Sequence, residues 1–172
     1  MKRTIIFLLM FAVLISTAFS AKWFSLEATD EWGDKTGKKY LACLSDQAVY
    51  SNNTVSNEDM YYCSIIYDPD EALDSNFKSY IMVRAYKYSK GPGYSDFIND
   101  VRPIDIQVQY ADATTTIECC IMTDYGIIYP ADDTAESQLV QLAKRTHTDG
   151  GRLRIKGALA DCNWSFRAQF NF

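Results

Sequence analysis

Histidine is nearly absent from this chain, because its 172 residues include a single one, His147. A Ser-His-Asp mechanism needs a histidine held between a nucleophile and a carboxylate. His147 instead follows Lys144 and Arg145 near the end of an expected helix, where the helix dipole favours cations. The chain also lacks the Gly-x-Ser-x-Gly turn of many serine hydrolases. We therefore predict no catalytic residue, which favours a protein that is not an enzyme.

Motifs that bind metals are missing as well. The sequence has no Cys-x-x-Cys pair and no twelve-residue calcium loop. We predict neither a metal nor another cofactor. Acidic residues do gather in three places that we expect to be turns or helix caps: Asp30, Glu31 and Asp34; Asp68, Asp70 and Glu71; Asp132 and Asp133. They leave one enzymatic alternative, a secreted hydrolase that uses loop carboxylates.

Basic runs are short. After residue 20 no basic run is longer than a pair such as Lys38-Lys39, and the net charge of the whole chain is −5. Because an acidic protein repels phosphate backbones, we predict that it does not bind nucleic acid. Apolar residues make up 48% of the sequence, which indicates a folded core rather than a disordered chain.

Long apolar runs are absent beyond residue 20, and the run before it resembles an export signal. Met1-Lys2-Arg3 precedes the apolar stretch 5–15, and small residues follow up to Ser20. This order is typical of a secretory signal peptide. We predict a signal peptide over residues 1–20 and a single domain over residues 21–172.

The predicted destination is the periplasm or the extracellular space. No later stretch is apolar enough for a membrane-spanning helix, so we expect no stable membrane span after signal cleavage. No cysteine lies near the predicted cleavage point, and we therefore predict that the domain is not lipid-anchored.

Cysteines follow the predicted signal peptide, and they are Cys43, Cys63, Cys119, Cys120 and Cys162. Since an exported chain meets oxidising conditions, we predict two disulfides and one unpaired thiol. Their spacing does not choose the partners. Successive side chains on a strand point to opposite faces, so only one of the adjacent Cys119 and Cys120 is expected to face the core.

Apolar and polar residues alternate with a period of two along most of the chain, as half-buried strands require. The clearest case runs from Ile104 to Tyr110, and 162–172 repeats it with aromatic residues. Strands are also expected at 24–28, 39–50, 60–67, 77–88, 114–122, 127–129 and 152–159. About eight or nine strands separated by turn signals predict an antiparallel β-sandwich, with a closed β-barrel as the alternative.

One short helix is predicted near residues 133–147. Asp133 is expected to cap it, and Glu136 has the spacing of a capping box. Gly150 is expected to end it. An apolar stripe on this helix would face the core, and it consists of Ala135, Leu139, Leu142 and Ala143.

A turn is predicted between the first two strands. The segment from Asp30 to Gly37 is rich in turn-forming residues. We expect Asp34 to accept backbone hydrogen bonds there and Gly37 to adopt the left-handed conformation that a bulged hairpin requires.

Aromatic residues are in excess, with 12 tyrosines, 9 phenylalanines and 3 tryptophans. Most alternate with polar residues and are expected in the core. Tyr86, Tyr88 and Tyr94 flank a Gly-Pro-Gly loop and are predicted to bind a partner, because exposed tyrosines stack on sugars or fill protein pockets. The sequence therefore favours a non-enzymatic binding module for an unknown protein or glycan. A structural component that assembles through a sheet edge is a further alternative.

The segment Trp32-Gly33-Asp34-Lys35-Thr36-Gly37 resembles the Phe/Trp-Gly-Asp-x-Thr-Gly turn near the mature start of certain small exported bacterial proteins. The other end is similar too, with Leu139 and Leu142 in a helix, a Gly-x-Leu-x-Ile segment at 151–155 and an aromatic-rich final strand. The chain departs from these proteins in its five cysteines. The resemblance implies export and a β-sandwich, and it carries over no catalytic residue, since these proteins have no established activity.

Overall fold

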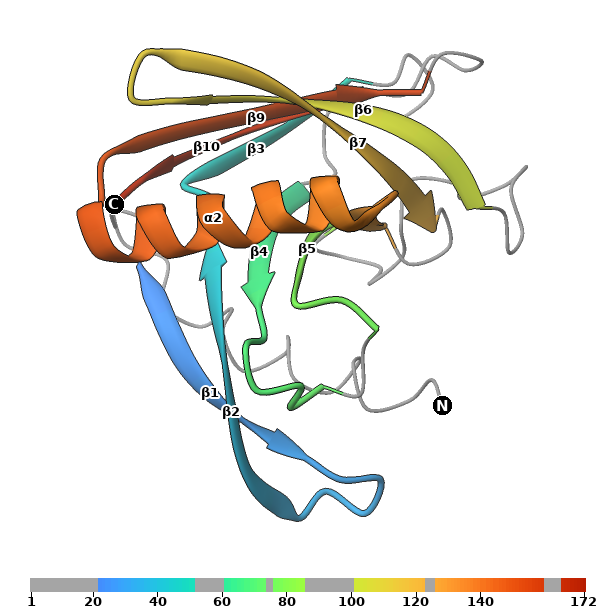
Figure 1. Cartoon of the computed structure of the whole chain (residues 1–172), viewed down its shortest axis with the longest axis vertical. Helices are drawn as coiled ribbons and strands as arrows, with labels where there is room; N and C mark the ends of the chain where they lie inside the picture. Colours follow the sequence, from blue (N-terminus) through green and yellow to red (C-terminus); the bar gives the residue numbers. More distant parts are fainter. Residues whose placement is uncertain (1–21, 52–60, 74–75, 86–100, 123–125, 160–164) are drawn as a thin grey trace.

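The structure, a computed structural model, describes residues 22–51, 61–73, 76–85, 101–122, 126–159 and 165–172 (Figure 1). Within these ranges the chain forms ten strands and one helix. The strands are β1 (Trp23–Thr29), β2 (Lys35–Leu44), β3 (Gln47–Ser51), β4 (Tyr61–Tyr67), β5 (Ser79–Ala85), β6 (Val101–Tyr110), β7 (Ala113–Met122), β8 (Ile127–Pro130), β9 (Arg152–Ala158) and β10 (Ser165–Asn171). The helix, α2, spans Asp133–Asp149.

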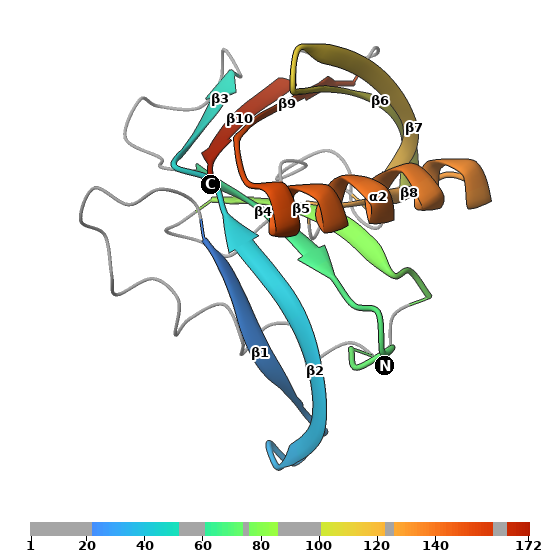
Figure 2. The same cartoon turned by 60° about the vertical axis from the view of Figure 1, so that its left-hand side comes forward.

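The ten strands belong to one antiparallel sheet in the order β1-β2-β4-β3-β10-β9-β6-β7-β8-β5. Strand β5, at the end of this order, also pairs with β4, so the sheet curls back on itself. Strands β3 and β4 share a single residue pair, Ala48 with Tyr61. The β1–β2 hairpin extends away from the curled part (Figures 1 and 2).

The predicted fold class is confirmed, since the described chain is mainly antiparallel β with one helix. Its layers, however, come from one continuous sheet that folds over itself rather than from two separate sheets. The sheet is not closed into a barrel, which was the predicted alternative; where β3 meets β4, the two strands share one residue pair.

The stretch predicted as one strand over 39–50 is divided into β2 and β3 at Ser45 and Asp46. The backbone N–H of Ser45 donates to the carbonyl of Cys63 over 2.8 Å, whereas that of Asp46 donates to a carbonyl of β10 over 2.9 Å. The carboxylate of Asp46 also accepts hydrogen bonds from the backbone, over 2.9 Å, and from the side-chain amide of Asn171. The chain therefore exchanges β4 for β10 as its partner within two residues.

The main core lies between the curled sheet and α2. Strands contribute the fully buried side chains Ile65, Ile81, Val83, Ile106, Ile121, Ile128, Leu153, Ile155 and Phe170. The helix contributes Ala135, Leu139 and Ala143, three members of the predicted stripe, and it contacts β4, β5, β7 and β8. Burying a large apolar side chain contributes roughly 1.5–3 kcal/mol, so this core is the main source of stability.

A smaller apolar cluster covers the other face of β1, β2, β4, β5 and β8. Its buried members are Ala28, Tyr40, Ile66, Tyr80 and Met82. Phe77, which precedes β5, stacks on Tyr129 with ring centroids 4.7 Å apart and packs against this cluster. Residues 63–67 of β4 are thus buried on both faces, which explains why this stretch shows no alternation of apolar and polar side chains.

The cap of the helix lies one residue before the predicted one, and the helix begins at Asp133. Asp132, not Asp133, is the cap, because its carboxylate accepts a hydrogen bond from the backbone N–H of Ala135 over 2.7 Å. Glu136 does not complete a capping box with Asp133 and instead accepts from the backbone N–H of Lys78 over 2.8 Å. Gly150 ends the helix as predicted, with a φ of 66°.

Candidate functional site

The β1–β2 hairpin is an arm that projects from the body of the molecule (Figures 1 and 2). Its two strands pair from Trp23 with Cys43 to Thr29 with Lys35, and a bulge interrupts the register between Glu27 and Thr29. Most side chains on the half of the arm near the turn are exposed. The arm therefore presents its tip to solvent on all sides.

Side chains along the arm hold its strands together. Glu27 accepts a hydrogen bond from the backbone N–H of Gly37 over 3.1 Å, and its carboxylate lies 3.3 Å from the ammonium group of Lys35. The hydroxyl of Thr36 donates to the carbonyl of Ala28 over 3.0 Å. These contacts make the arm stiffer than a hairpin held by backbone hydrogen bonds alone, and less entropy is lost when its tip binds a partner.

The tip itself is a tight turn organised by Asp30. One carboxylate oxygen of Asp30 accepts hydrogen bonds from the backbone N–H groups of Trp32 and Asp34, each over 2.9 Å. The carboxylate that organises the turn is thus that of Asp30, whereas Asp34 accepts a backbone hydrogen bond from the N–H of Asp30 through its carbonyl oxygen, over 2.9 Å. Gly33 and Gly37 have φ values of 89° and 77°, in the left-handed region that favours glycine.

Trp32 is the most exposed large apolar side chain described, with 82% of its surface accessible to solvent. A second exposed aromatic residue, Phe24 at 48%, lies on the same hairpin. Leaving an indole ring in water forgoes the stabilisation that burial would give. A turn that displays one in a defined position is therefore a candidate binding site.

Trp32 is not among the binding residues predicted from the sequence. Those residues, Tyr86, Tyr88 and Tyr94, lie outside the described ranges. The sequence does contain a signal for the exposure of Trp32. This aromatic residue lies inside a segment of turn-forming residues, outside the alternating pattern that places side chains in the core.

His147 packs against an aromatic residue at the base of the arm. Its ring meets that of Trp23 edge-on, with centroids 5.9 Å apart, and Trp23 in turn stacks on Phe172 at 6.1 Å. His147 is exposed at the end of α2, as the sequence predicted. In the described contacts, His147 therefore packs against β1, close to the last residues of the chain.

The four described cysteines are unbonded, so the predicted disulfides do not form among Cys43, Cys63, Cys119 and Cys120. The register gives the reason, because Cys43 lies opposite Ile65 and Cys63 opposite Val83. Cys43 and Cys63 are therefore diagonal neighbours on adjacent strands and do not face each other directly. The last predicted partner, Cys162, lies outside the described ranges.

Burial makes three of these thiols poor nucleophiles. It raises the pKa of Cys119 to about 12, with a smaller contribution from Cys120. Burial likewise raises the pKa of Cys43 and Cys63 far above the ordinary thiol range. Because the thiolate is the reactive form, these side chains act as small core residues near neutral pH.

The carboxylates nominated for a hydrolase are held by backbone groups. Asp68 is fully buried and accepts hydrogen bonds from the backbone N–H groups of Ala72 and Leu73, each over 2.8 Å. Asp30 organises the hairpin turn and Asp132 caps α2. Each of these three carboxylates therefore acts on local structure.

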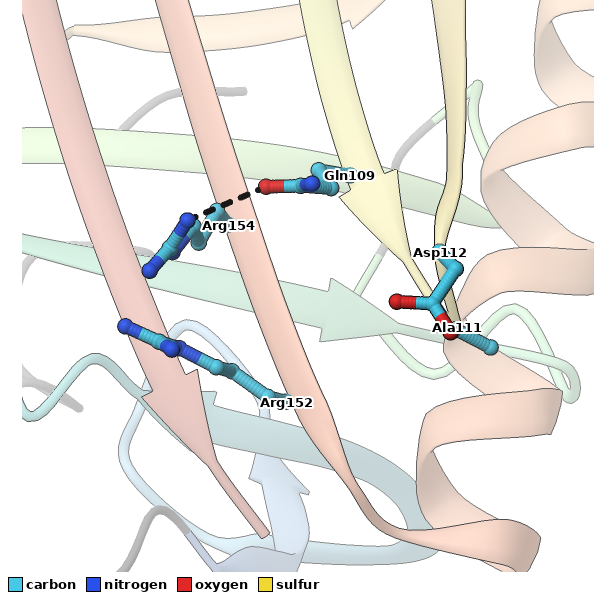
Figure 3. Close-up of a pocket in the computed structure, with 5 residues that line it drawn as sticks. All are labelled: Gln109, Ala111, Asp112, Arg152 and Arg154. Carbon is cyan, nitrogen blue, oxygen red and sulfur yellow. Dashed lines mark hydrogen bonds between the residues drawn. The ribbon is translucent and has the colours of Figure 1, made fainter.

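A shallow hollow lies at the end of β6 and the start of β9 (Figure 3). Its lining consists of Gln109, Ala111, Asp112, Arg152 and Arg154. Asp112 is the single carboxylate among these residues, so the hollow lacks the two acids of a glycosidase. Over the part of the chain described, His, Cys, Asp and Glu form no cluster suited to a metal ion.

No family model, curated protein or solved structure matches the chain. Among the helices of the described ranges, none combines the length and hydropathy needed to cross a bilayer.

Proposed function

We propose that the protein is an exported, non-enzymatic binding module that recognises a protein or glycan partner through the tip of the β1–β2 arm. The observation that carries the proposal is the exposed indole of Trp32, held on a turn that Asp30 organises. A tryptophan offers a large apolar surface with few rotatable bonds. It is also a side chain that commonly dominates the free energy of protein interfaces.

Export supports the same conclusion. The basic start, the short apolar stretch and the small residues before position 21 are those of a secretory signal peptide. An exported domain meets other proteins and surface glycans, and an aromatic ring on an arm suits either partner. Indole faces stack on sugar rings, and indole edges fit protein pockets.

The test compares Trp32→Ala and Trp32→Phe with the unaltered protein. Binding is measured to glycans on an array and, by photocrosslinking from the neighbouring exposed position 31, to proteins of the producing cell's exported fraction. Loss of an interface tryptophan costs about 2 kcal/mol or more, so Trp32→Ala is expected to weaken binding about 30-fold or more. Trp32→Phe keeps an aromatic ring and is expected to lose less.

Val101→Ala provides the matched control, since Val101 is also a large apolar residue, 50% exposed, and lies outside the arm at the start of β6. It should bind like the unaltered protein. Equal binding by Trp32→Ala and Val101→Ala would refute the proposal. Because Trp32 is so exposed, its replacement leaves the melting temperature nearly unchanged.

One observation favours assembly through a sheet edge as a second candidate function. Strand β1 pairs with β2, and its other side pairs with no strand of the described ranges. An open edge is a template for a strand from another chain. This function predicts an oligomer at micromolar concentrations in sedimentation velocity, and a monomer at all concentrations would count against it.

A further inference from the structure

The outer face of β9 and β10 carries a concentration of positive charge. Along β9 the exposed side chains are Arg152, Arg154, Lys156 and Ala158, and they alternate with buried Leu153, Ile155 and Gly157. Arg167 is the exposed residue in the middle of β10. We call Arg152, Arg154, Lys156 and Arg167 the basic face.

The register makes the basic face continuous. Arg167 lies opposite Lys156, and Gln169 lies opposite Arg154. On the other side of β9, Lys156 pairs with Gln107 and Arg154 with Gln109 of β6. Across the β6–β7 pairing, Gln107 lies opposite Thr116 and Gln109 lies opposite Thr114, so β7 continues the two rows. Cations thus adjoin a strip of exposed amides and hydroxyls.

Neutral partners hold the two arginine side chains. Arg154 donates to the amide oxygen of Gln109 over 3.2 Å, and Arg152 donates to that of Gln169 over 2.7 Å (Figure 3 shows the first). A glutamine orients a guanidinium group and leaves its charge in place, whereas a glutamate would cancel that charge. The remaining N–H donors stay available to an anion.

Charge balance sets this face apart from the rest of the molecule. Among the described residues, none of the four cations of the basic face forms an ion pair, and the pair that does occur joins Lys35 to Glu27 on the arm. Carboxylates lie at the two ends of the face. Asp105 and Glu118 share the row of Ala158, and at the other end Asp112 lies beside the hollow and Asp46 binds Asn171, which is opposite Arg152. The whole chain nevertheless has a net charge of −5.

We propose that the basic face binds an acidic polysaccharide. Cations on alternate residues of β9 are spaced by roughly 6.5–7 Å, which suits carboxylates repeated along an extended chain. The adjoining amides and hydroxyls of Gln107, Gln109 and the threonines of β7 suit sugar hydroxyls.

Other polyanions fit the face less well. The rows that carry the cations contain no described aromatic residue on β10, β9, β6 and β7, so the face lacks the stacking platforms of proteins that bind single strands. The same rows offer no large apolar anchor for a protein interface. This inference does not depend on the arm, which lies at the opposite end of the molecule (Figure 1).

The experiment measures binding of the full chain to polygalacturonate by calorimetry at low and moderate salt. The double substitution Arg154→Gln with Lys156→Gln is expected to weaken binding about tenfold and to reduce its salt dependence. Lys144→Gln, with Lys144 exposed on α2, is the control for loss of a charge and should bind normally. Trp32→Ala should also bind normally, which separates this proposal from the function of the arm.

Four outcomes would overturn the proposal. The first is equal binding by the double variant and the unaltered protein. The second is equal affinity for uncharged dextran, because charge would then play no part. The third is equal or tighter binding to polyglutamate or to single-stranded DNA, which would assign the face to another class of polyanion. The fourth is a dimer that the double substitution dissociates, which would show that the face binds the acidic surface of a second copy.

Discussion

Adjacent residues of one strand can lie in opposite environments, and Cys119 and Cys120 show this. Cys119 is buried in the core opposite Ile104, whereas Cys120 is partly exposed on the outer face of β7. The alternation predicted from the sequence is therefore confirmed for this pair. The same alternation places the cations of β9 outside and its leucine and isoleucine inside.

This difference predicts the order in which thiols are alkylated in the native protein. Iodoacetamide should modify Cys120 well before Cys43, Cys63 and Cys119, because burial hides the other three sulfurs and raises their pKa values. Peptide mass mapping after short exposures measures each site separately. In concentrated urea the rates should become similar. Native modification of Cys119 as fast as Cys120 would contradict the burial described.

The local sequence narrows the end of a helix or strand to a few residues, and hydrogen bonds in the folded chain decide among them. Two acidic residues precede α2, and both are suitable caps, yet only Asp132 has the extended backbone and the hydrogen bond of a cap. Asp133 is the first helical residue and is exposed. In the same way, the segment 39–50 is predicted as one strand, but the strand is interrupted at Ser45 and Asp46, where the backbone N–H of Asp46 bonds to β10.

The two aspartates before α2 give a matched pair of substitutions. Asp132→Ala should lower the free energy of unfolding by about 1 kcal/mol, since it leaves a backbone N–H of the first turn without its partner. Asp133→Ala should cost only a few tenths of that, because it removes a favourable charge near the helix dipole and no cap. Urea unfolding followed by circular dichroism measures both. Equal losses would place the cap elsewhere.

At the scale of the whole molecule, one sheet encloses the main core with its inner face and α2, while part of its outer face supports the second cluster. Tyr40 belongs to that second cluster and is 3% exposed. Burial, and secondarily the charge of Asp68, raises its pKa to about 12. The protonated phenol of Tyr40 therefore contributes to the stability of the folded state.

The shift predicts a loss of stability at alkaline pH. The folded state holds the phenolic proton more tightly than the unfolded state, so the stabilisation is complete below pH 10 and is lost as the pH rises towards 12. Tyr40→Phe should make the fall in unfolding free energy over this window shallower by up to about 1.4 kcal/mol per pH unit. Urea titrations at several pH values measure the slopes. Parallel slopes for both proteins, whatever their offset at pH 7, would contradict the prediction.

Much of the fold follows from the sequence by itself. The strands lie close to their predicted positions and the helix near 133–147 is confirmed, because periods of two and of 3.6 residues and turn-forming residues are local signals. The positive-φ glycines at 37 and 150 are confirmed for the same reason. The same local signals predicted Asp34 in the turn and Asp133 at the helix cap. The carboxylates that accept the backbone hydrogen bonds there belong to their near neighbours Asp30 and Asp132.

Only the tertiary structure decided which strands meet. Asn171 donates a hydrogen bond to Asp46, which is far away in the sequence, and Arg167 lies opposite Lys156 on the neighbouring strand. Cys43 and Cys63 lie diagonal to each other on adjacent strands and are not bonded. Each of these depends on a pairing between strands distant in sequence, and the alternation of one strand carries no information about its partner. The exposure of Trp32 was decided in the same way, because β4 pairs with β2 over Leu41–Leu44 and no further strand of the described ranges pairs with the arm near its tip.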